Sequence, residues 1–145
     1  MSKKLHPMYL LVLAAVVFLA ACGASGPSIS VEEAWVRPDP LWENAAGYFL
    51  ITNDGNESDY LIEVRLEFAD MSMVHETVME GDVHKMLHRE RVEVPAGGQV
   101  EFKPLSFHVM IMGLIEGLEL GDDVTLVLVF EESGEIEVQA ELRQE

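Results

Sequence analysis

The stretch VTLVLVFEESGEIEVQAEL, residues 124–142, contains the two clearest strand patterns of the sequence. Residues 124–130 are an apolar run rich in β-formers, as is typical of a buried strand. Residues 135–142 alternate between polar and apolar side chains, as is typical of a strand that buries one face. An acidic turn separates the two segments. The stretch therefore predicts two β-strands that close the folded domain.

Short strands separated by turns continue upstream of this stretch. Asn53-Asp54-Gly55, Glu80-Gly81-Asp82 and Pro95-Ala96-Gly97-Gly98 are turn signals, and the sequence has no convincing amphipathic helix of three turns. A pattern of this kind predicts an all-β sandwich or barrel of about 7–9 short strands. The other expected strands are residues 28–36, 47–52, 60–68, 71–79, 83–92, 99–103 and 107–114.

The N-terminal segment has the pattern of a signal peptide. Two lysines precede an apolar run over residues 9–21, which is too short to span a bilayer, where roughly 20 residues are needed. The run ends in Leu19-Ala20-Ala21-Cys22, which resembles a bacterial lipobox; an ordinary secretory signal with an incidental cysteine is the alternative. We expect a signal peptide over residues 1–21, a lipidated Cys22 with a flexible tether over residues 22–27, and one folded domain over residues 28–145.

The charge and the motif content exclude several classes of function. The net charge is −17, and it becomes −19 when the signal peptide with its two lysines is removed. Such an acidic chain disfavours nucleic acid as a partner, and solubility explains most of the charge. The sequence contains no Gly-x-Ser-x-Gly elbow and no phosphate-binding glycine loop. We therefore expect a binding protein and not an enzyme.

Methionine and histidine are concentrated in one third of the mature chain. All six methionines and all four histidines after Cys22 fall between residues 71 and 112. Alternate residues of a strand share a face, so each expected strand in this region would direct its methionines and histidines to one side. The ten residues are Met71, Met73, His75, Met79, His84, Met86, His88, His108, Met110 and Met112.

This combination of donors favours copper. Thioether sulfur is a soft, neutral ligand that selects Cu(I), and imidazole is compatible with it. Hard cations prefer oxygen, and structural zinc sites usually include thiolates. A blue-copper centre needs a cysteine ligand, and Cys22 is the single cysteine. The residues alone thus predict a Met/His site for Cu(I) outside the cytoplasm, where free thiols tend to oxidise.

The spacing of four of these residues resembles a known family. His75, Met86, His108 and Met110 follow the H-x10-M-x21-H-x-M pattern of the periplasmic copper chaperone family called PCu(A)C. The resemblance covers nearly the whole mature domain. Further segments that look like family landmarks are Ala34-Trp35-Val36-Arg37, Ala46-Gly47-Tyr48, Thr52-Asn53, Pro95-Ala96-Gly97-Gly98 and residues 108–114.

The resemblance implies a fold, a cargo and a ligand set. It implies a cupredoxin-like Greek-key β-sandwich that binds one Cu(I) per chain through the four residues of the motif. Thr77 and His84 stand where many relatives have methionine. The resemblance therefore does not specify which residues surround the four ligands. Met71 and Met73 are candidates for a weak alternate ligand, and His84 and His88 are candidates for Cu(II) or a second ion. Met112 is a secondary candidate that is expected mainly to pack beside the site.

The expected function is copper delivery at a membrane surface. The chain would be a lipid-anchored metallochaperone, in the periplasm or on the outer face of the cytoplasmic membrane. Its partner would be a copper acceptor, either the cytochrome oxidase subunit that holds the dinuclear copper centre or a thiol-bearing chaperone. Copper storage or detoxification, a surface-anchored β-sandwich for protein interaction and, last, a copper enzyme remain as alternatives.

Overall fold

The computed structural model describes residues 25–145. The predicted signal peptide and Cys22 lie outside the described residues. Within residues 25–145 no helix is long and apolar enough to cross a membrane. The strands are β1 (Ile29–Pro38), β2 (Asn44–Asn53), β3 (Asp59–Leu66), β4 (Ala69–Glu80), β5 (Val83–His88), β6 (Val92–Val94), β7 (Gln99–Phe102), β8 (Phe107–Leu114), β9 (Asp123–Phe130) and β10 (Gly134–Leu142).

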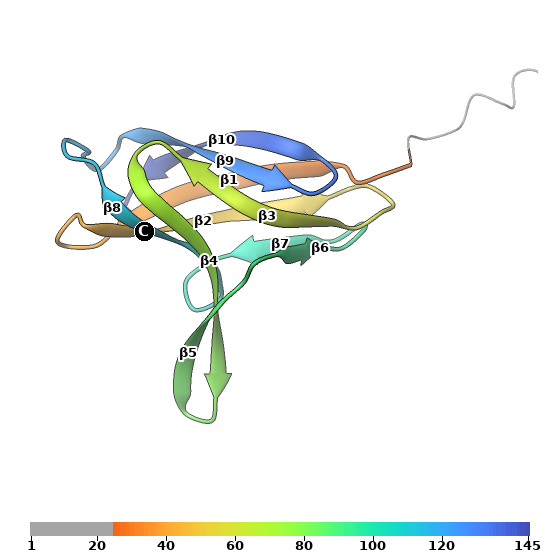
Figure 1. The fold of residues 1–145 in the computed structure, drawn as a ribbon, viewed down its shortest axis with the longest axis horizontal. Helices are drawn as coiled ribbons and strands as arrows, with labels where there is room; N and C mark the ends of the chain where they lie inside the picture. The colour runs from red at the N-terminus through yellow and green to blue at the C-terminus, as the bar shows by residue number, and fades with distance from the viewer. Residues whose placement is uncertain (1–24) are drawn as a thin grey trace, which may run out of the picture.

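The strands form one continuous sheet that folds over on itself (Figure 1). Their order is β5-β4-β8-β7-β2-β1-β10-β9-β3-β6, and β8 also pairs with β2. The β1–β10 and β7–β8 pairs are parallel, and the other pairs are antiparallel. Because β3 packs against β4, the two halves of the sheet enclose a common core.

The core confirms the strand patterns at the C-terminal end of the chain. Alternate residues of β9 are buried, and β10 buries Ala140 and Leu142 near its end. On the other side of the sandwich, the rings of Phe49 and Phe102 stack with their centroids 4.4 Å apart. The largest fully buried side chains are Phe49, Phe102, Phe130, Ile51, Leu61, Ile111, Leu126, Leu128, Leu142, Val36, Val94 and Val109.

A buried carboxylate ties β3 to the turn between β9 and β10. Asp59 is fully buried, and its carboxylate accepts hydrogen bonds from the backbone N–H groups of Tyr60 (2.7 Å), Glu132 (2.9 Å) and Ser133 (2.9 Å). Burial alone would raise the pKa of Asp59, but these hydrogen bonds to the charged form outweigh it, and the pKa is lowered.

The all-β prediction is confirmed, but the described part contains ten strands where about 7–9 were expected. The difference arises because the segment expected as one strand over residues 83–92 is divided. β5 pairs with β4 and is exposed along its length, whereas β6 pairs with β3 and buries Val92 and Val94 in the core. The chain has to leave the surface and enter the sandwich between them, so one ladder cannot include both.

The β4–β5 hairpin projects away from the sandwich (Figure 1). The first part of β4, residues 69–76, pairs with β8, and the last part, residues 75–80, pairs with β5. The turn predicted around Gly81 is confirmed, and Gly81 has a φ of 64°, a conformation that glycine adopts without strain. We call the part of this hairpin beyond β8, residues 77–86, the arm.

Candidate metal site

The register of three strands brings the methionines and histidines together. β4 lies between β8 and β5, and directly opposed residues of antiparallel strands point to the same side of a sheet. The opposed pairs are Met71–Met112, Met73–Met110, His75–His108, His75–His88, Thr77–Met86 and Met79–His84. Consecutive pairs are two residues apart and therefore share this side. We call the side that carries these eleven residues the Met/His face.

The Met/His face is the side of the sheet that points away from the core. The residues between its members, such as Val74, Val109 and Ile111, are buried in the core. Within the described chain, none of the six methionines belongs to the core cluster or packs against it. Core packing therefore does not account for the clustering of methionine in this segment.

Three histidines form a row across the Met/His face. The ring centroid of His75 is 5.8 Å from that of His108 and 5.9 Å from that of His88. Exposure increases along the row, since His108 is 8% exposed, His75 is half-buried and His88 is exposed. In residues 25–145 no group of three or more histidine, cysteine or acidic side chains is placed to hold a metal.

The Nδ1 atoms of the two more buried histidines lie in different surroundings. Nδ1 of His108 lies 3.1 Å from the carbonyl oxygen of Ser106. When Nδ1 donates that hydrogen bond, Nε2 is left with its lone pair free for a metal. Nδ1 of His75 is buried and finds no hydrogen-bond partner among residues 25–145. Burial lowers the pKa of His75, and the neighbouring His108 and His88 lower it further.

The two motif methionines flank this row from opposite directions. Met110 is half-buried on β8, two residues from His108. Met86 lies on the arm, two residues from His88, and is 67% exposed. The structure thus brings the four predicted ligands, His75, Met86, His108 and Met110, onto adjoining positions of one face. That they bind metal stays a prediction.

The four secondary candidates lie on the same face at increasing distance from the row. Met73 is opposite Met110, and Met112 is one pair further along β8. His88 is part of the row itself, whereas His84 lies near the tip of the arm opposite Met79, where both side chains are exposed. His84 is therefore separated from the row by the Thr77–Met86 pair.

Two pairings were not foreseen from the sequence. His75 and His88 are equally far from the centre of the turn at residues 81–82, so they are opposed. The predicted turn could therefore have indicated this pair. The Met71–Met112 pair depends on the register of β4 against β8, which are distant in sequence. No local signal specifies that register.

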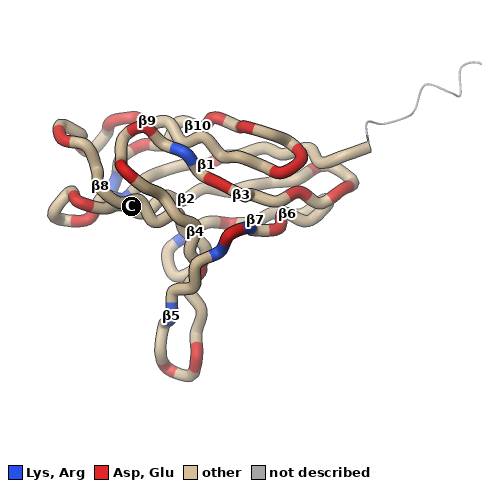
Figure 2. The backbone as a smooth tube through the Cα atoms, in the orientation of Figure 1, with Lys and Arg blue, Asp and Glu red and all other residues tan. Residues whose placement is uncertain are grey.

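The Met/His face is uncharged in a strongly acidic protein. Residues 71–75 and 107–112 contain no charged side chain, although the net charge is −17. Figure 2 shows acidic positions distributed over the loops and strands of the sandwich. Glu76, next to His75, pairs with Arg89 at 2.6 Å. An ion on this face would thus be held by neutral donors and not by charge.

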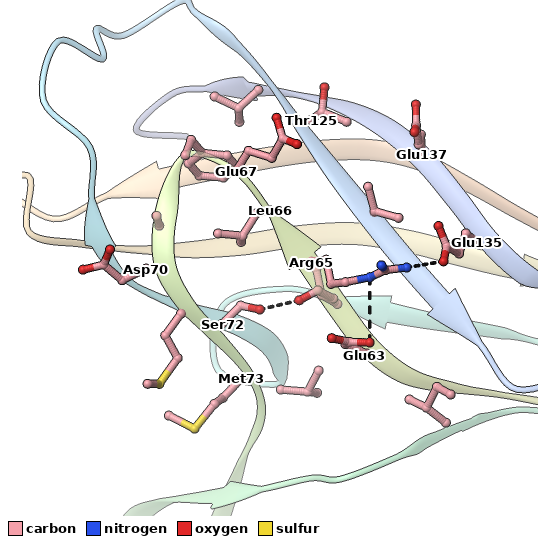
Figure 3. A pocket seen from close by; sticks show the side chains of 18 of the residues that line it. Glu63, Arg65, Leu66, Glu67, Asp70, Ser72, Met73, Thr125, Glu135 and Glu137 are labelled. Atoms are coloured by element: carbon pink, nitrogen blue, oxygen red, sulfur yellow. Dashed lines mark hydrogen bonds and ion pairs between the residues drawn. The ribbon is translucent and has the colours of Figure 1, made fainter.

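A groove of about 1240 Å³ adjoins one end of the Met/His face (Figure 3). Strands β3, β4, β9 and β10 contribute to its walls, and Met71, Met73 and His88 are among the residues that line it. Arg65, which lines the groove, forms ion pairs with Glu63 of the same strand and with Glu135 of β10. The soft donors of the Met/His face are therefore accessible from a recess as well as from the arm.

Comparison with known proteins identifies the relatives of this chain. A family model described as "Putative lipoprotein LpqE-like" matches residues 29–142. "Putative lipoprotein Lxx21020" of Leifsonia xyli subsp. xyli (strain CTCB07) is 27% identical over 109 residues. That alignment covers 74% of this chain and 65% of the relative, so the chain spans less than two thirds of that protein's length.

Two solved structures share the fold of this chain. The copper-bound PCuAC domain from PmoF2 superimposes with a TM-score of 0.69 at 23% identity, over 85% of this chain and 97% of that domain. The solution structure of CuI-DR1885 from Deinococcus radiodurans gives a TM-score of 0.67 at 24% identity, over 88% of this chain and 86% of that one. The predicted fold, that of PCu(A)C domains, is confirmed.

Proposed function

The chain belongs to the LpqE-like family, and from this premise we propose that it is an extracytoplasmic Cu(I)-binding metallochaperone. Its cargo is one Cu(I) ion held by His75, Met86, His108 and Met110. The chain passes this ion to an acceptor at the membrane and is not an enzyme. The PCu(A)C-like fold supports the proposal, because solved structures with this fold include copper-bound and CuI forms.

One observation carries the proposal: soft, neutral donors are gathered on a single uncharged face outside the core. The four motif residues, distributed over 36 positions of sequence, occupy adjoining places on that face. Thioether and imidazole suit Cu(I), and the buried, unpaired Nδ1 of His75 and the oriented ring of His108 suit metal coordination. The donor set therefore fits the cargo.

The proposed ligands differ in exposure, and this difference suggests the order in which an acceptor would replace them. His108 and Met110 hold the ion from the sandwich side, while Met86 on the arm covers it from the solvent side. A partner with thiolate ligands would first replace the exposed Met86, since that ligand is the most accessible. The buried histidine would release the ion last. Each step exchanges one neutral ligand for another donor, and copper keeps its oxidation state.

The N-terminal segment and the family description support an extracytoplasmic, lipid-anchored location. The lipobox-like segment ending at Cys22 agrees with the lipoprotein description of the family. A lipid at Cys22 would confine the domain to the membrane surface, in the periplasm or outside the cytoplasmic membrane, and raise its concentration near a membrane-bound acceptor. The dinuclear copper centre of cytochrome oxidase is the acceptor that we propose, directly or through a thiol-bearing chaperone.

The test is an anaerobic Cu(I) titration against a competing chelator. Residues 28–145 contain every described strand and the whole core, so this domain is the sample. We expect one tight equivalent in the native domain and its loss in a Met86→Ala/His108→Ala variant. A tight equivalent that the variant retains, or the absence of a tight equivalent from the native domain, would contradict the proposal.

Storage is the second candidate, because the Met/His face has more donors than one ion needs. A storage protein would keep its copper when a thiolate acceptor is added, whereas a chaperone would release it. Mixing the copper-loaded domain with a dithiol-containing acceptor and measuring the copper in each protein after separation distinguishes the two.

A further inference from the structure

One end of the Met/His face contains sulfur donors only. Met71 is directly opposite Met112, and Met73 is directly opposite Met110. Directly opposed residues of an antiparallel pair have Cβ atoms about 4.5–5.5 Å apart. The next pair lies two residues along each strand and on the same side. Four thioethers therefore surround one patch of sheet, and the proposed first site uses only Met110 of the four.

Packing does not explain these methionines. Within the described chain they are absent from the core cluster and from the residues that pack against it. Met71 is 52% exposed, and Met73 and Met112 are half-buried. Figure 3 shows the Met73 side chain at the groove that adjoins this end of the face. Three thioether side chains thus lie side by side outside the core.

We propose that Met71, Met73 and Met112 bind a second soft monovalent ion, Cu(I), beside the first. The inference rests on the proposed function, because it takes the ion at the first site to be Cu(I). Three neutral sulfur donors select Cu(I) over the hard cations, and no carboxylate belongs to the set. Methionine has three rotatable side-chain bonds, so the three sulfur atoms can close around one ion.

The second position adjoins the first through the Met73–Met110 pair. An ion that exchanges Met110 for Met73 moves from the histidine row toward the groove. This gives the cargo a second exit, distinct from the arm. The second position binds more weakly than the first, because it has no imidazole ligand and is more exposed.

The stoichiometry of Cu(I) binding tests the proposal. Native mass spectrometry of the anaerobic domain, residues 28–145, should show two Cu(I) ions per chain. A Met71→Leu/Met73→Leu/Met112→Leu variant should bind one, because leucine keeps the volume and removes the sulfur. Circular dichroism checks that the variant is folded. A native domain that binds one ion, or a variant that still binds two, overturns the second position.

Methyl resonances locate the second ion. In the domain labelled with [¹³C]methyl-methionine, the signals of Met86 and Met110 should shift with the first equivalent of Ag(I), a soft monovalent probe. The signals of Met71, Met73 and Met112 should shift with the second. Met79→Leu is the matched control, since Met79 is an exposed methionine of the same face outside both sets, and it should leave two ions bound.

The two proposals fail in different ways. In the Met86→Ala/His108→Ala variant the tight equivalent should disappear while the weaker one remains. Loss of both ions in that variant overturns an independent second position but leaves the proposed function intact. Retention of the tight ion contradicts the proposed function. Shifts of all five methyl signals with a single equivalent also overturn the second position.

Discussion

Strand β8 presents two different regions of the molecule from one backbone. Val109 and Ile111 are fully buried in the sandwich, whereas His108, Met110 and Met112 lie on the opposite side. The core consists of branched aliphatic and aromatic side chains, and the Met/His face of flexible thioethers and imidazoles. Because the period of a strand is two residues, the chain assigns stability and metal chemistry to alternate positions.

The comparison implies that the two regions can be changed independently. A cavity in the core should lower the free energy of unfolding and leave Cu(I) affinity unchanged in the folded molecules. Removal of a donor from the Met/His face should lower Cu(I) affinity and leave the free energy of unfolding unchanged.

The largest effect is expected from a cavity in the core. Leu128 on β9 is fully buried and opposite Ile136 of β10. Leu128→Ala should lower the free energy of unfolding by about 2–5 kcal/mol, through lost burial and the cavity left behind. Urea denaturation measures this change. Cu(I) affinity, measured below the unfolding transition, should match that of the native domain; a reduced affinity would show that the two regions are coupled.

A smaller loss of stability is expected at the buried carboxylate. Asp59→Asn places an NH₂ group against backbone N–H donors, so we expect a loss of about 2 kcal/mol at neutral pH. The pKa of Asp59 is lowered by folding. Its stabilising contribution is therefore complete above the unfolded pKa of about 3.9 and is lost as the pH falls through the lower folded value.

The measurement is urea denaturation of both proteins between neutral and strongly acidic pH. The difference between native and variant should be constant at neutral pH and shrink at acid pH. Asp54→Asn, at an exposed turn position, is the matched control and should change stability little. A difference that persists unchanged at acid pH would show that the charge of Asp59 is not the cause.

The contrast between the two regions also explains what the sequence revealed. The buried strand at residues 124–130 and the turn at Gly81 depend on local patterns, and both were predicted. The division of residues 83–92 depends on a distant partner, since β5 joins β4 whereas β6 joins β3. The polar-apolar pattern of residues 83–92 does not indicate where the partner strand changes.

The candidate site shows the same limit. The resemblance to the PCu(A)C pattern implied that His75, Met86, His108 and Met110 belong together, and strand periodicity predicted the shared side of each strand. Which donors are neighbours depends on the order β5-β4-β8 and on the register of these strands. Met112 was a secondary candidate expected mainly to pack beside the site. It is directly opposite Met71, and this pairing comes from a contact between segments about 40 residues apart.

The next prediction concerns pH and the metal. A histidine must be neutral to ligate, so Cu(I) affinity should fall below about pH 6.5, by up to tenfold per pH unit for each histidine that must lose a proton. Burial and the neighbouring histidines lower the pKa of His75, so its part of the loss occurs at more acid pH. Competition titrations at stepped pH, with the chelator calibrated at each pH, measure the loss. A flat profile would mean that the histidines are not ligands.

The smallest effect, and the sharpest test of the face, is a gain of one donor. Thr77 lies directly opposite Met86. Thr77→Met adds a thioether on the Met/His face and should raise Cu(I) affinity a few-fold, less than about 1.4 kcal/mol. Val78→Met adds the same thioether one residue later, on the opposite face, and should leave the affinity unchanged. Equal gains from both variants would show that methionine content, and not the face on which it lies, determines copper binding.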